Sequence, residues 1–144
     1  ALLDNETCED LNIKQGRLTH NNRMCDKIIR EYTQIIRDYI NGKTHELKDT
    51  QLLKPSGYIV NTFNNAIYWA KENSVENCII NAVNHGGDSD TIAAIAGSIS
   101  GSIYGYSTIP KRWIEKLDEN VKEQIEKFVE YLCDGNVNDD RNKI

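Results

Sequence analysis

Residues 86–97 read GGDSDTIAAIAG and join a glycine turn directly to a run of small and apolar residues. The carboxylates of Asp88 and Asp90 lie two residues apart, and the hydroxyl of Thr91 follows them. A helix beginning here would stabilise these like charges through its dipole and its free backbone amides. Mg²⁺ or Mn²⁺ would do so better, because both ions prefer carboxylate, hydroxyl and water oxygens. The stretch therefore predicts a helix start with two open alternatives: an aspartate N-cap or a metal site.

The rest of the chain shows the apolar period of helices, and no segment shows the alternation of a strand. We therefore predict an all-α fold. The expected helices cover residues 24–40 (closed by Gly42), a segment from about 58 or 60 to 71, a segment capped by Ser74 and a segment from 88–91 onward. Two more are expected: a helix opened by Pro110 that includes Trp113, Ile114 and Leu117, and one over about 121–132 with an end near Gly135. We expect inward-facing residues at Phe63, Ala66, Ile67, either Trp69 or Ala70, Cys78, Ile79, Ala82 and Val83.

Three glycines, Gly97, Gly101 and Gly105, recur every fourth residue and share one face of the helix that follows the aspartates. Each glycine costs about 1 kcal/mol relative to alanine in a helix interior, so three in register require a reason. Close approach of a neighbouring helix to this face supplies one. We therefore expect this helix to lie at the centre of the fold.

Length and composition limit the class of protein. The 144 residues predict one domain over residues 1–144, with a polar, frayed segment at 136–144. The net charge of −5 comes without a basic cluster, which argues against a nucleic-acid binder, and the apolar run at 91–104 is too short to span a membrane. The cysteines lack zinc-finger spacing and predict reduced, mostly buried thiols in the cytoplasm. They are Cys8, Cys25, Cys78 and Cys133.

Four ordered blocks resemble the C-terminal half of ADP-ribosylglycohydrolases, the family that includes the enzyme reactivating bacterial nitrogenase reductase. The blocks are SGYIVNTF at 56–63, AIYWA at 66–70, GGDSDTIAA at 86–94 and IPKRW at 109–113, and the resemblance covers roughly residues 17–117. It implies an orthogonal multi-helix fold around a binuclear Mg²⁺ or Mn²⁺ site. It also implies hydrolysis of the bond between the anomeric carbon of ADP-ribose and a modified protein side chain.

The resemblance also implies roles for single residues. It carries Asp88, Asp90 and Thr91 onto metal-ligand positions. The implied substrate-binding residues are His20, Tyr58, Gly86 and Gly87. Taken alone, His20 is typical of a capping or surface histidine, and Tyr58 of a half-buried aromatic residue. No catalytic base is assigned.

The family carries a helix-borne Glu, a Thr-Asp-Asp-Thr segment and an Asn-Gly segment before the matched region, and residues 1–18 contain none of them. We therefore expect this chain to supply half of the metal site, with an N-terminal half or a second chain completing it. Without that half, an exposed apolar surface is expected. The alternative is a catalytically inactive relative that binds ADP-ribose or is structural, like the crystallins of this fold.

Three remaining side chains have simpler interpretations. His85 precedes the double glycine and is expected at a helix C-terminus, where a histidine interacts favourably with the helix dipole. Trp69 and Trp113 occur at helical spacing with other apolar residues and are expected to pack in the core.

Overall fold

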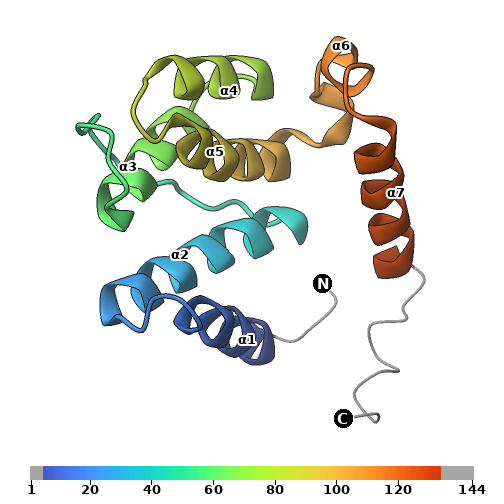
Figure 1. Cartoon of the computed structure of the whole chain (residues 1–144). Helices are drawn as coiled ribbons and strands as arrows, with labels where there is room; N and C mark the ends of the chain where they lie inside the picture. Colours follow the sequence, from blue (N-terminus) through green and yellow to red (C-terminus); the bar gives the residue numbers. More distant parts are fainter. Residues whose placement is uncertain (1–4, 134–144) are drawn as a thin grey trace, which may run out of the picture.

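The computed structural model describes residues 5–133, which are helical without any strand in that range (Figure 1). This confirms the predicted all-α class. The elements are α1 (Asn5–Arg17), α2 (Arg23–Ile40), α3 (Ile59–Ala70), α4 (Val75–Asn84), α5 (Ser89–Tyr104), the 3₁₀ turn η1 (Tyr106–Thr108), α6 (Lys111–Ile114) and α7 (Glu119–Cys133). The predicted end of the last helix near Gly135 and the predicted segment at 136–144 lie outside the described residues.

Polar side chains begin two of these helices. Ser74 accepts a hydrogen bond from the backbone N–H of Asn77 at 3.1 Å at the start of α4, which confirms the predicted cap. Asn22 accepts one from the N–H of Met24 at 2.7 Å at the start of α2. The predicted end of α2 is also confirmed, because the helix stops at Ile40 and Gly42 follows with a φ of 70°.

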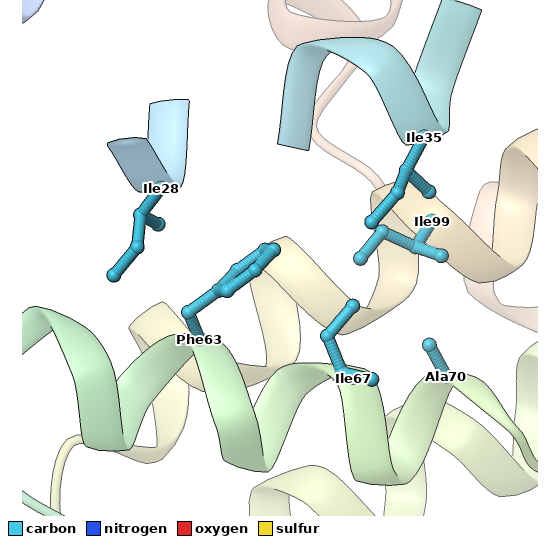
Figure 2. Packing of buried hydrophobic residues seen from close by; sticks show 6 residues of the cluster. All are labelled: Ile28, Ile35, Phe63, Ile67, Ala70 and Ile99. Atoms are coloured by element: carbon cyan, nitrogen blue, oxygen red, sulfur yellow. The ribbon is translucent and has the colours of Figure 1, made fainter. Parts of the chain in front are cut away.

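Helix α5 packs against α2, α3 and α4, and this confirms its predicted central position. One core cluster joins α2, α3 and α5 (Figure 2), and its members are Ile28, Ile35, Phe63, Ile67, Ala70 and Ile99. A second cluster of mostly small residues joins α3, α4 and α5, and its members are Ala66, Cys78, Ala82, Ile92, Ala93 and Ala96. Small side chains here let the three helices approach closely.

The predicted glycine face is only partly used. A Cβ at Gly97 would lie 3.2 Å from both Cδ1 and Cγ1 of Ile79 on α4, so close approach is real at this position. The prediction is wrong at Gly101, where nothing lies within 4 Å of such an atom. It is also wrong at Gly105, which follows the last residue of α5 and has a φ of 83°. That glycine ends the helix, a conformation that few other residues adopt.

Four further predictions need correction. Val83 is 49% exposed although it was expected to face inward, because it lies on the outer side of α4. The helix opened by Pro110 covers only Lys111–Ile114 and is shorter than predicted. Trp113 on that helix and Cys25 on α2 are half-buried rather than buried. Trp69 is also half-buried, but it packs against the core as predicted.

No element was predicted over residues 5–17, where the structure has α1. Its apolar contribution is small: Ile13 is 5% exposed, but Leu11 is 49% exposed. Polar contacts between α1 and α2 supply the rest of the attachment of α1, including a salt bridge of 3.0 Å between Glu9 and Arg30. The Asn12 amide also donates to the Thr33 hydroxyl at 3.0 Å.

Helix α7 extends away from the other helices (Figure 1), and its apolar side chains remain exposed, as expected for an uncovered apolar surface. The exposed fractions are 46% for Val121, 50% for Ile125, 61% for Phe128 and 50% for Val129. Among residues 5–133, no helix is both long enough and apolar enough to cross a membrane.

Candidate functional site

A pocket of about 520 Å³ lies where the α1–α2 connection, the start of α3 and the start of α5 meet. Four residues singled out from the sequence line it: His20, Tyr58, Asp88 and Thr91. Asp90, Gly86 and Gly87 are not among its lining residues. Other side chains of the lining, which sequence reasoning missed, include Cys25, Ile29, Thr62 and Ile95.

The carboxylate of Asp88 is not used as a helix cap, although Asp88 occupies the N-cap position of α5. Its side chain accepts no hydrogen bond from a backbone amide, and its Oδ1 accepts one from the Thr91 hydroxyl at 2.8 Å. Asp90 lies in the first turn of α5 and is exposed. The Asp88 carboxylate and the Thr91 hydroxyl are thus held together at the positive end of the α5 dipole, with Asp90 in the same turn.

The glycines before Asp88 shape the turn. Gly86 and Gly87 have φ values of 82° and 63°, a conformation that side chains other than hydrogen disfavour. A Cβ on Gly87 would lie 2.4 Å from the Cβ of Pro55, so the turn rests against the loop that leads to Tyr58. This contact sets Asp88 and Tyr58 on two sides of one pocket.

Polar side chains of α3 hold that loop. Asn65 is fully buried and pairs with the backbone of Leu53, accepting from its N–H at 2.8 Å and donating to its C=O at 3.1 Å. The Thr62 hydroxyl donates to the carbonyl of Ser56 at 2.9 Å. Tyr58 follows this anchored segment and is 58% exposed, which leaves its ring free for a ligand. Two buried polar residues among the apolar positions of α3 were the sequence signal for this arrangement.

His20 lies in the connection between α1 and α2. Its backbone N–H donates to the carbonyl of Gly16 at 3.0 Å, and its Nδ1 lies 3.0 Å from the Thr19 hydroxyl. A two-point pair then closes the connection, since Arg17 Nε and Nη2 lie 3.1 and 2.6 Å from the two carboxylate oxygens of Asp26. Hydrogen bonding from Arg17 lowers the pKa of the Asp26 carboxyl.

A hard divalent cation suits the donors on this turn, because the two carboxylates and the hydroxyl are all oxygen ligands. The Asp88 carboxylate is free of backbone amides, which keeps its second oxygen available. Among the described residues, however, no group of three or more His, Cys, Asp or Glu side chains is arranged to hold a metal. Within the described residues, the turn therefore offers oxygen donors but does not form a complete metal site.

Comparison with known protein families identifies the class to which this helical fold and its aspartate turn belong. The sequence profile of ADP-ribosylglycohydrolases matches residues 11–142, so the chain belongs to the ADP-ribosylglycohydrolase family.

Three relatives illustrate the similarity. The ADP-ribosyl-[dinitrogen reductase] glycohydrolase of Rhodospirillum rubrum is 30% identical over 137 residues, 83% of this chain and 47% of that protein. The ADP-ribosylarginine hydrolase Tri1 of Serratia proteamaculans is 37% identical over 95 residues, 65% of this chain and 25% of that protein. The human ADP-ribosylhydrolase ARH3 is 44% identical over 41 residues, 28% of this chain and 11% of that protein. The chain thus spans about half the length, or less, of these relatives.

Proposed function

We propose that this chain contributes to a metal-dependent hydrolase that removes mono-ADP-ribose from modified protein side chains. The observation that carries the proposal is the pocket that joins His20, Tyr58, Asp88 and Thr91 from three distant segments. The names of two relatives, which specify dinitrogen reductase and ADP-ribosylarginine as substrates, support an ADP-ribosylated protein as the substrate of this chain.

The pocket suits the chemistry of ADP-ribose. Its volume of about 520 Å³ lies within the range of small-molecule sites. The exposed ring of Tyr58 offers a face on which a base can stack, and His20 offers a ring nitrogen for a hydrogen bond.

Asp88, Asp90 and Thr91 would hold Mg²⁺ or Mn²⁺ as half of a binuclear site, with an N-terminal half or a second chain supplying the other ligands. A metal held there would supply Lewis acidity and lower the pKa of a bound water. The chain's own contribution is positional: the hydroxyl of Thr91 orients the Asp88 carboxylate, and negative charge on the turn stabilises an oxocarbenium-like ribose.

Calorimetric titration of ADP-ribose into the chain, with excess Mg²⁺ and again in EDTA, tests the binding step. Metal-dependent binding supports the proposal. Binding that is equal in both buffers, without release of ADP-ribose from modified arginine, supports the alternative of an inactive binding protein. No binding in either buffer means that this chain alone does not form the ADP-ribose site.

Substitutions test the proposed metal ligands and are made in the form of the protein that releases ADP-ribose from a modified substrate. Asp90→Ala should lower activity on the order of 100-fold, because even a partner of a metal ligand contributes 10- to 100-fold. Asp49→Ala is the matched control, since Asp49 is a fully exposed carboxylate paired with Lys71 outside the pocket. Near wild-type turnover of Asp90→Ala contradicts the assignment.

Thiol labelling locates the ligand independently of turnover. Cys25 lines the pocket, whereas Cys8, equally free and half-buried, does not. ADP-ribose should slow alkylation of Cys25 and leave Cys8 unchanged. Cys78 serves as the unreactive reference, because burial raises the pKa of its thiol to about 11. Equal protection of Cys8 and Cys25 contradicts binding in this pocket.

A further inference from the structure

A hydrogen bond outside the pocket links α3 to the residue that precedes the glycine turn. The indole Nε1 of Trp69, in the last turn of α3, donates to Nδ1 of His85 at 3.2 Å. The two rings meet edge to face, with centroids 5.8 Å apart and planes at 74°. His85 directly follows α4 and is followed by Gly86 and Gly87.

The chemistry of the bond fixes the state of His85. An indole N–H is a donor only, so Nδ1 of His85 must present a lone pair. The tautomer that forms this bond carries its proton on Nε2. This bond defines both the tautomer and the orientation of the imidazole ring.

Both partners are themselves held in place. Trp69 packs against the small-residue cluster of α3, α4 and α5 and lies edge to face with Tyr68, with centroids 5.0 Å apart. The backbone N–H of His85 donates to the carbonyls of Asn81 and Ala82 at 3.0 and 3.3 Å. The bond thus connects two residues that other contacts already hold in place. It therefore restricts the conformations open to the residues that follow His85.

The next residues need such order, because two consecutive glycines have more conformational freedom than any other pair. On the far side, Gly87 rests against Pro55. On the N-terminal side of the two glycines, His85 carries the last side chain before Asp88. The turn is thus held from two directions, by Pro55 and by the Trp69–His85 bond.

We propose that Trp69 is a positioning residue for Asp88 and Thr91 and acts through the imidazole of His85. The effect of Trp69 on ligand binding rests on the proposed function. Its effect on the conformation of the 86–88 turn is measurable in the chain without ligand. Trp69→Phe keeps an aromatic ring and removes the donor. His85→Asn keeps an acceptor, and His85→Leu removes it.

Amide hydrogen exchange of residues 86–92 is the primary test. Trp69→Phe and His85→Leu should each speed exchange in this segment three- to tenfold, the range expected for one hydrogen bond. His85→Asn should stay near wild type. Trp113→Phe is the matched control, because the chain's other tryptophan lies on α6, away from the turn. Unchanged exchange in Trp69→Phe, or equal effects of His85→Asn and His85→Leu, overturns the proposal.

Two further readouts separate positioning from general destabilisation. The ¹⁵N shift of His85 Nδ1 should report an unprotonated nitrogen in the wild type and a tautomer mixture in Trp69→Phe. The dissociation constant for ADP-ribose with Mg²⁺ should rise by the same three- to tenfold in Trp69→Phe and stay near the wild-type value in His85→Asn. If the wild type binds no ADP-ribose, the proposed binding function of this chain fails, and the exchange rates alone decide the role of Trp69.

Discussion

The body formed by α2–α5 and the outlying helix α7 carry the same apolar repeat but differ in burial. Phe63 in the body is 2% exposed, whereas Phe128 on α7 is 61% exposed. In the body, apolar side chains of α2, α3, α4 and α5 form two buried clusters. On α7, Ile125 and Val129 border an apolar groove of about 830 Å³ shared with α6 and η1. The comparison shows that periodicity predicts which face of a helix is apolar but does not predict which element covers that face.

The largest expected difference between the two regions lies in their phenylalanines, which are the only two in the chain. Phe63→Ala should lower the free energy of unfolding by about 3–5 kcal/mol, because it removes a buried ring and leaves a cavity. Phe128→Ala should change it by no more than about 0.5 kcal/mol. Urea unfolding followed by circular dichroism measures both values.

Equal losses of unfolding free energy in Phe63→Ala and Phe128→Ala would contradict the described difference in burial between the body and α7. That result would mean that α7 is covered in solution, and the unfolding midpoint of the wild type would then rise with protein concentration. A concentration-independent midpoint together with a neutral Phe128→Ala keeps the distinction.

A smaller effect is expected within the body, at the two glycines inside α5. Gly101→Ala should raise the free energy of unfolding by about 0.5–1 kcal/mol, because helix propensity improves and the new methyl group meets nothing. Gly97→Ala should gain less, since Ile79 must move to accept it. A larger gain at Gly97 than at Gly101 contradicts the packing described for α4 and α5.

The smallest effect is expected where α1 joins the body. Because Arg17 lowers the pKa of Asp26 in the folded state, unfolded chains bind more protons at low pH. The stabilisation is complete above the ordinary aspartate pKa of about 3.9 and is lost as pH falls through the lower folded-state value. Asp26→Asn should flatten the acid limb of stability against pH.

A matching variant sharpens this test. Arg17→Gln removes the cause of the shift, so it should flatten the same limb, and the double variant should add nothing further. The side chain of Arg17 is 50% exposed, which keeps the contribution small. An unchanged acid limb in Asp26→Asn contradicts a stabilising role for the pair.

Much of the fold follows from local patterns. The repeat in α2, the Ser74 cap and the inward face of α3 were all predictable from spacing alone. Helix α1 was not, because its attachment depends on pairs such as Arg17–Asp26 and Glu9–Arg30, which form only once the helices meet. The failed glycine face has a similar cause: spacing places Gly97 and Gly101 together but does not show where Ile79 reaches.

The site divides in the same way. The residues 86–91 indicated an acidic turn at a helix start, and the described geometry has one. That His20 and Tyr58 lie beside it depends on how three segments pack, and only the family resemblance pointed to them. The Trp69–His85 bond joins residues 16 positions apart, and neither residue type signals such a link in sequence.

The placement of the two indoles has an optical consequence. Trp69 lies in the body, hydrogen-bonded to an imidazole, while Trp113 lies beside the apolar groove of α7 with the Arg112 guanidinium 5.5 Å from its ring centre. The two tryptophans of the chain therefore lie in two distinct environments. Emission from Trp69 reports on the residue before the aspartate turn, and emission from Trp113 reports on whatever covers α7.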